Sequence, residues 1–269
     1  MTLPPAYLLV THGSRDPRPQ IAVERLAYLV RQQLLEETAL VYSASRQRQQ
    51  KDSKGGVGLT AAIGRAQSPL VGTAALEFAS VPLHERIGQF ARQARGAGLN
   101  RVQILPLFLL PGVHVRGDIP TEVALAQQAL GEEVTLELRP HLGSHPGMTP
   151  LLAGQFSQLP AQGRILLAHG SRLRTGNQGV ETIASQLEAV AAYWSVSPSL
   201  AGQVEALVAA GKRQIAIAPY FLFAGGIADA IAQQVQYLRQ VFPQVKLLLG
   251  EPLGATVFLA RLIVEGMER

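Results

Sequence analysis

The chain contains the same sequence pattern twice, and this internal repeat limits the folds that it can adopt. An apolar run that ends in His-Gly-Ser-Arg occurs at 7–15 (YLLVTHGSR) and again at 164–172 (RILLAHGSR). A second pattern, which starts with proline and ends with glycine, occurs at 106–112 (PLFLLPG) and again at 219–225 (PYFLFAG). Because both patterns keep their order, the 269 residues predict two lobes of one fold, related by internal duplication.

Short apolar runs alternate with longer helix-like segments in both halves. Such alternation predicts parallel strands that are joined by crossover helices. We expect an α/β fold of two similar lobes, each a parallel sheet of about four strands flanked by helices. The expected strands are 6–11, 71–76, 101–108, 134–138, 165–168, 192–196, 215–219 and 246–249. The expected helices are 21–37, 83–97, 118–129, where Asp118 can act as the N-cap, and 255–266.

Aligning the two repeats divides the chain into domains. We expect an N-terminal domain at 1–140, a linker at 141–163 and a C-terminal domain at 164–269. The linker is expected because prolines and glycines are concentrated there. The segment 43–68 has no counterpart in the second half. Since it is polar and glycine-containing, we expect a flexible surface insertion between the first helix and the second strand.

Composition restricts the chemistry and the partners. The chain has no cysteine, so it has no disulfides, thiolate metal sites or cysteine nucleophile, and any metal must be bound by imidazole or oxygen. No apolar stretch approaches the ~20 residues of a membrane helix, and 6–10 is too short for a signal peptide. We therefore expect no membrane partner and a cytoplasmic location. The net charge of +5 favours an anionic partner. Nucleic acid is not expected, because the densest basic run, 46–54, has no interleaved aromatic residues.

Three side chains with metal-binding or acid–base chemistry are expected at neighbouring strand ends in the first half. His12 follows the first strand, Glu77 ends the second and His114 lies on the loop after the third. Ligands of parallel α/β sheets gather outside the carboxyl ends of the strands, so the three should face one crevice. Two imidazoles and a carboxylate can bind a divalent metal, and each can also accept a proton. Both roles stay open for each residue.

The second half keeps only one of these three side chains. Counting from the repeated patterns aligns His169 with His12, Trp194 with Glu77, and Ile227 with His114. Neither tryptophan nor isoleucine can bind a metal or accept a proton. We therefore expect a degenerate site in the C-terminal domain, where the remaining histidine has a structural role.

Several motifs, in the same order, resemble those of the sirohydrochlorin chelatases, the class II chelatases of the CbiX/SirB type. They are 11–18 (THGSRDPR), then 76–79 (LEFA) with Pro82 and Leu83, then 106–109 (PLFL) with Gly112, His114, Asp118, Ile119 and Pro120. The resemblance covers nearly the whole chain apart from 43–68. It implies chelatase-like lobes of flavodoxin-like topology. The duplicated form resembles a fused dimer, so a monomeric pseudo-dimer is expected.

The resemblance implies an enzyme, a lyase of the metal chelatase type, whose partners are sirohydrochlorin and a divalent metal. His12, Glu77 and His114 match the family's metal site, and His12 and His114 are the expected catalytic residues. The carboxylates of the tetrapyrrole are expected to meet Gly13, Ser14, Arg15, Arg18 and Arg116. We expect Fe²⁺ as the substrate metal, which gives sirohaem, with Co²⁺ as the alternative for cobalamin biosynthesis. No permanently bound cofactor is expected.

Two other functions compete with a chelatase. A non-catalytic carrier of a tetrapyrrole or a metal would use the same pocket without turnover. A phosphoryl-transfer enzyme could use the run 11–15, but the chain has no glycine-rich Walker pattern. In addition, Thr11 stands where histidine phosphatases have an arginine. Turnover of sirohydrochlorin with a metal separates these alternatives.

Overall fold

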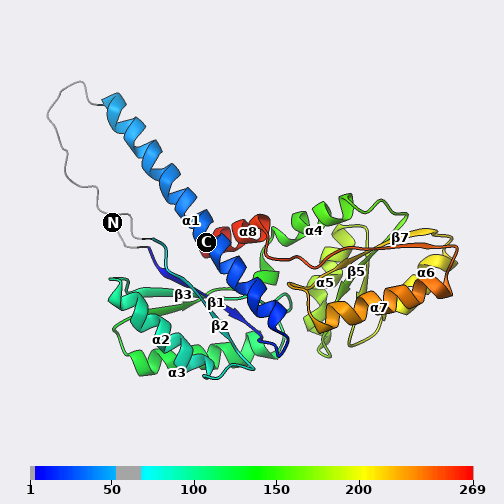
Figure 1. The fold of residues 1–269 in the computed structure, drawn as a ribbon, viewed down its shortest axis with the longest axis horizontal. Coiled ribbons are helices and arrows are strands. Elements are labelled where there is room, and N and C mark those ends of the chain that lie inside the picture. The colour runs from blue at the N-terminus through cyan, green and yellow to red at the C-terminus, as the bar shows by residue number, and fades with distance from the viewer. Residues whose placement is uncertain (1–3, 53–67, 269) are drawn as a thin grey trace.

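The computed structural model describes residues 4–52 and 68–268, which form two α/β lobes (Figure 1). Each lobe has a four-stranded parallel sheet, in the order β2-β1-β3-β4 in the first and β6-β5-β7-β8 in the second. The strands are β1 (Ala6–Thr11), β2 (Val71–Ala75), β3 (Arg101–Pro106), β4 (Thr135–Leu138), β5 (Gly163–Ala168), β6 (Val190–Tyr193), β7 (Gln214–Pro219) and β8 (Lys246–Leu249). The helices are α1 (Pro17–Asp52), α2 (Leu83–Gly96), α3 (Ile119–Leu130), α4 (Met148–Ser157), α5 (Arg174–Gln186), α6 (Leu200–Ala209), α7 (Gly226–Val241) and α8 (Val257–Glu268). The predicted fold class and the duplication are confirmed.

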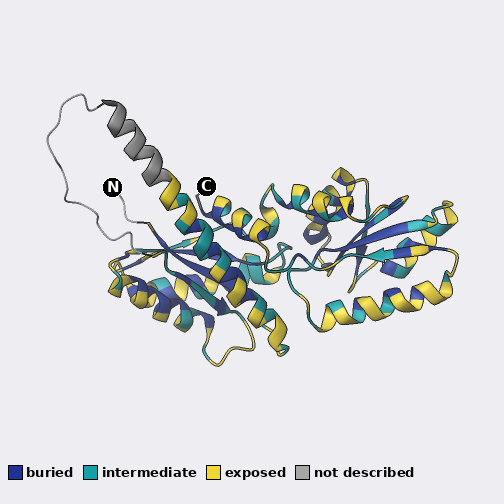
Figure 2. Cartoon of the chain, turned by 45° about the horizontal axis from the view of Figure 1, so that its top comes forward, coloured by how far each residue is buried: buried dark blue, intermediate teal, exposed yellow. Residues whose placement is uncertain are grey.

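Strand β1 shows why the apolar runs form central strands. Its first five residues are buried, because both faces of the sheet are covered by helices. Tyr7 and Leu9 belong to a core on the α1 side, whereas Leu8 and Val10 belong to a second core under α2 and α3. Figure 2 shows buried strands between helices whose outer faces are exposed. The carboxyl ends of the strands are thereby left to carry the functional loops.

The two lobes exchange their last helices. Helix α8, from the second half of the sequence, packs against α1 of the first lobe (Figure 1), and α4, from the first half, packs against β7 of the second. Two hydrogen bonds attach α8 to the first lobe: Arg261 Nε donates to Gln33 Oε1 of α1 at 3.0 Å, and Arg139 Nη2, directly after β4, donates to the Gly266 carbonyl at 3.2 Å. As a result, one hydrophobic core runs through both lobes.

Three local expectations need correction. The segment 141–163 is more than a linker, because it contains a 3₁₀ turn (Leu142–Ser144) and α4. Residues 43–52 of the expected flexible insertion continue α1 as a helix, and 53–67 lie outside the described residues. Glutamine, arginine and lysine are good helix formers, so a polar run can extend a helix. Strand β6 lies two residues earlier than expected and ends at Tyr193.

Membrane insertion of a helix finds no support in the part of the chain that the structure describes. None of its helices combines the length and the apolar character that crossing a membrane requires.

Candidate metal site

His12 and Glu77 are brought together because β1 and β2 stay paired beyond their regular ends. The amide of Leu76 donates to the Thr11 carbonyl at 2.9 Å, and the amide of Glu77 donates to the His12 carbonyl at 2.8 Å. The two side chains therefore leave neighbouring strands at the same level. His12 Nε2 lies 3.9 Å from Glu77 Oε2, and both side chains are nearly half exposed. This is the crevice predicted at the carboxyl ends of the strands.

The backbone at this junction has an unusual conformation on both strands. Gly13 has φ +95°, and a Cβ at this position would lie 1.9 Å from the carbonyl oxygen of Glu77. Only glycine permits this close approach. Phe78, directly after Glu77, has φ +57°, an uncommon and costly conformation for a bulky residue. Strain of this kind is typical of functional sites, and here it lies beside the candidate ligands.

His114 enters the site from a π-helical turn, His114–Asp118, that leads into α3. We expected Asp118 to cap that helix, but its side chain makes no capping hydrogen bond. Instead, the Asp118 carboxylate lies 2.7 Å from His114 Nδ1. A carboxylate on one imidazole nitrogen fixes the ring and leaves the other nitrogen for a metal. His12 is similar, since its Nδ1 lies 3.2 Å from the Gly13 carbonyl and is placed to donate to it.

The three predicted residues form a compact cluster. The rings of His12 and His114 meet edge to face, with their centroids 4.9 Å apart. One ligand atom from each of His12, Glu77 and His114 lies within 4.8 Å of the others. Ligands at about 2.0–2.2 Å from an ion are about 3–4 Å apart, so small side-chain rotations would complete a site. Two imidazoles and a carboxylate suit Fe²⁺ or Co²⁺.

Apolar rings surround the cluster and extend across both lobes. Phe78 and Phe108 lie 6.4 and 6.3 Å from the His12 ring, centroid to centroid. A cavity of about 180 Å³ adjoins His12 and is lined on its far side by Leu222 and Phe223 of the second lobe. Apolar side chains from both lobes therefore lie close to His12.

Comparison with known proteins assigns the family. The CbiX family model matches the chain at residues 47–159 and 163–269. The chain belongs to the CbiX family. The first match starts after β1, so the inclusion of His12 in the site rests on the geometry. No curated protein matches the chain.

Three solved structures are similar to this CbiX family member, and at these identities the similarity shows the fold. SirB from Bacillus subtilis with Fe³⁺ is 18% identical with a TM-score of 0.70, covering 99% of this chain and 95% of that chain. SirB from Bacillus subtilis subspecies spizizenii in complex with cobalt is 18% identical with a TM-score of 0.66, covering 99% and 94%. CbiX of denitrifying bacteria, the terminal enzyme for biosynthesis of sirohaem, is 21% identical with a TM-score of 0.56, covering 98% of both chains.

The residues expected to bind substrate carboxylates have different surroundings in this CbiX family member. Arg15 lies over the Phe78 ring, 5.2 Å from its centroid. Arg116 makes no ion pair among the described residues. The pKa of His141 is lowered, mainly by burial and to a smaller extent by the positive charge of Arg116. Ser14 Oγ accepts a hydrogen bond from the Asp16 amide at 3.0 Å.

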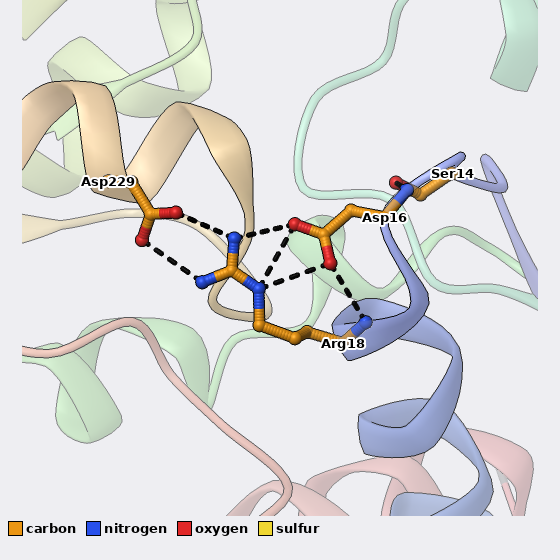
Figure 3. Close-up of polar contacts among 4 residues, drawn as sticks. All are labelled: Ser14, Asp16, Arg18 and Asp229. Carbon is orange, nitrogen blue, oxygen red and sulfur yellow. Dashed lines mark hydrogen bonds and ion pairs between the residues drawn. The ribbon is translucent and has the colours of Figure 1, made fainter.

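Arg18 differs from these side chains, because its guanidinium is already engaged by two carboxylates. It contacts Asp16 and, across the lobes, Asp229 (Figure 3). The backbone conformation at position 13 requires glycine, whether or not Gly13 contacts a ligand. Arg15 and Arg116 therefore remain as the charged groups that are available to a ligand.

The second half of the CbiX fold corrects one aligned pair. The amide of Ser195 donates to the His169 carbonyl at 2.9 Å, as the amide of Glu77 does to His12. Ser195, rather than Trp194, is therefore the counterpart of Glu77. Counting residues gave the wrong pair because the second-half loop before α6 is one residue shorter. Ser195 Oγ donates to the His169 carbonyl at 2.8 Å. His169 has no carboxylate neighbour of this kind among the described residues, which fits a structural role.

Proposed function

We propose that the chain inserts Fe²⁺ into sirohydrochlorin and so produces sirohaem. The observation that carries the proposal is the cluster of His12, Glu77 and His114, whose ligand atoms lie within 4.8 Å of one another. Membership of the CbiX family supports it. The similar SirB proteins are described as a sirohydrochlorin chelatase in complex with cobalt and as a protein with Fe³⁺.

The reaction exchanges one cation for two protons. As the metal bonds to the four pyrrole nitrogens, two pyrrole N–H bonds break and both protons leave, so no redox step and no nucleophile is needed. In the proposed mechanism the catalytic residues His12 and His114 hold the incoming cation, or one of them instead accepts a pyrrole proton. Glu77 is a further ligand or proton acceptor. A deprotonated imidazole can act as ligand or as base. Asp118 keeps the His114 ring oriented.

Other side chains suit the tetrapyrrole. Phe78 and Phe108 flank His12, and Phe223 faces it from the second lobe. Aromatic side chains bury large apolar surfaces, as a flat macrocycle requires. The guanidinium groups of Arg15 and Arg116 are suited to the peripheral carboxylates.

The test supplies sirohydrochlorin and Fe²⁺ and monitors metal insertion by the change in absorbance. His12→Ala and His114→Ala should lose turnover, because each removes a metal ligand, whereas His169→Ala should keep most of it. The matched comparison is sharp, since His12 and His169 occupy equivalent strand ends. Full activity in His114→Ala would contradict a single site in the first lobe.

The metal preference and the carrier alternative are tested together. Fe²⁺, Co²⁺ and Ni²⁺ are supplied in competition, because intrinsic affinity follows the general divalent series rather than biological use. A faster insertion of Co²⁺ at equal free metal would support the cobalt chelatase of cobalamin biosynthesis instead. Tight tetrapyrrole binding without insertion of any of the three metals would support a carrier.

A further inference from the structure

Arg18 connects the two lobes beside the candidate metal site. Its Nη1 and Nη2 donate to both carboxylate oxygens of Asp229, at 3.1 and 2.6 Å. Its Nε and Nη2 donate to Asp16, at 3.1 and 2.6 Å (Figure 3). Asp229 lies in the first turn of α7, Asp16 directly precedes α1, and Arg18 is the second residue of α1. We call these three residues the interlobe bridge.

The bridge is attached to both walls of the cavity next to His12. On the first lobe, the amide of Asp16 donates to Ser14 Oγ at 3.0 Å, which ties the bridge to the His12 loop. On the second lobe, the amide of Asp229 donates to the Gly225 carbonyl at 3.0 Å, close to the wall residue Phe223. The bridge therefore couples the loop that carries a candidate ligand to the loop that forms the opposite wall.

The geometry of the bridge favours a positioning role over a contribution to stability. All three side chains are partly exposed, and exposed ion pairs contribute little to stability. In contrast, an arginine that makes paired contacts on two sides is held in one orientation. The Gly225 backbone also lies near the side chain of Pro19, since a Cβ on Gly225 would be 3.4 Å from Pro19 Cγ. The loops of the two lobes thus approach closely at this point.

Among the described residues, the positions equivalent to the interlobe bridge in the other half of each repeat do not form a second bridge. Thr175 is the counterpart of Arg18, and Leu173 is the counterpart of Asp16. Arg116 is the counterpart of Asp229, because its amide donates to Gly112 as that of Asp229 donates to Gly225. No ion pair forms at these positions among the described residues. The bridge is therefore present at one edge of the pseudo-dimer, and the equivalent position at the other edge carries Arg116, which makes no ion pair among the described residues.

We propose that Arg18 is a positioning residue whose bridge to Asp16 and Asp229 sets the distance between the two walls of the tetrapyrrole cleft. This inference rests on the proposed function for its substrate. It replaces direct contact of Arg18 with substrate carboxylates, which its engaged guanidinium does not favour. The metal ligands all belong to the first lobe, so loss of the bridge should affect tetrapyrrole binding and leave metal binding unchanged.

The decisive variant is Asp229→Asn, because the two roles of Arg18 predict opposite effects. Sirohydrochlorin carries many carboxylates, so removing a nearby negative charge, and freeing Arg18, should strengthen its binding if the arginine contacts substrate. A positioning role predicts the reverse. We expect the KM for sirohydrochlorin to rise by roughly five- to tenfold in both Asp229→Asn and Arg18→Gln, the size typical of one lost contact, with kcat and the Kd for Co²⁺ within about twofold. Glu251→Gln, an exposed carboxylate elsewhere on the second lobe, is the control and should behave as the unaltered protein.

A measurement that does not depend on activity completes the test. Because the chain has no cysteine, spin labels can be placed at Glu85→Cys on α2 and Glu205→Cys on α6, one exposed position on each lobe. The distribution of label distances should broaden in Asp229→Asn and stay unchanged in Glu251→Gln. An unchanged distribution, a lowered KM in Asp229→Asn, or a parallel loss of Co²⁺ binding would overturn the proposal. Absence of metal insertion by the unaltered protein would overturn only the proposed function, and the label distances would still test the bridge.

Discussion

Replacement of Gly13 by alanine tests whether the backbone junction between β1 and β2 builds the metal site. The residue has φ +95°, and the new Cβ would lie 1.9 Å from the carbonyl oxygen of Glu77. Backbone cannot move aside as a flexible side chain can, so the His12 loop must shift by about 1.5 Å to restore an ordinary contact. Such a shift separates the strand ends that carry His12 and Glu77.

The expected cost follows from two terms. An L side chain in the left-handed region costs about 1–2 kcal/mol, which is partly offset by about 0.4–1 kcal/mol because alanine reduces the freedom of the unfolded chain. The shift also weakens the bonds from Leu76 to Thr11 and from Glu77 to His12, at about 1 kcal/mol each. We expect Gly13→Ala to lower the free energy of unfolding by about 3 kcal/mol, or about 6–12 °C in Tm.

Two glycines provide matched controls. Gly98 has φ +77°, and a Cβ added there would have no other atom within 4 Å, so Gly98→Ala carries only the conformational term, about 1 kcal/mol. Gly170 is the counterpart of Gly13, with φ +84° and a Cβ that would lie 2.7 Å from Val196 Cγ2. Gly170→Ala should therefore destabilise the protein without changing metal affinity.

The assay combines thermal unfolding with Co²⁺ titration at a temperature where every variant is folded. Gly13→Ala should weaken Co²⁺ binding by at least about tenfold, and neither control should. Equal metal affinity in Gly13→Ala and Gly98→Ala would refute the reasoning, because the clash with the Glu77 carbonyl would then have no effect on the ligands.

Two further predictions concern the side chains around this junction. Asp118→Ala should weaken Co²⁺ binding by about 10- to 100-fold while α3 stays folded, because the carboxylate orients a ligand and caps no helix; circular dichroism and metal titration check this. The bridge should survive mild acid: hydrogen bonds from Arg18 hold the pKa values of Asp16 and Asp229 below the ordinary value of 3.8. Since the folded-state pKa values are lowered, the stabilisation is present above 3.8 and is lost as the pH falls through the lowered values. The spin-label distribution at about pH 5 should therefore equal that at about pH 7.5.

Most of the fold could be predicted because buried parallel strands leave a strong local signal. The runs at 6–11 and 246–249 match β1 and β8 residue for residue. Prediction failed where the signal was compositional. The polar run after residue 42 indicated flexibility, yet its residues favour a helix and α1 continues to Asp52. The predicted position of β6 was wrong because the mostly apolar segment 189–196 is longer than the strand that it contains.

The candidate metal ligands could be predicted from the sequence, but the side-chain contacts around them could not. His12, Glu77 and His114 follow strands whose carboxyl ends must meet at one edge of the sheet. The pairing of Asp118 with His114 was hidden because an aspartate before a proline-containing first turn also reads as a helix cap. The engagement of Arg18 was hidden for another reason. Its partner Asp229 is 211 residues away, and only the packing of the lobes brings them together.

The exchange of α4 and α8 determines how this protein can be divided. A cut between the two family matches, at residues 160–162, would give a first piece without α8, which packs against its α1, and a second piece without α4, which packs against its β7. Each piece would expose the apolar surface that the missing helix covers, and the two would have to recombine to bury it. For this reason the unit that folds differs from the unit that was duplicated. A substitution in α8 is therefore constrained by its packing against α1 of the opposite half.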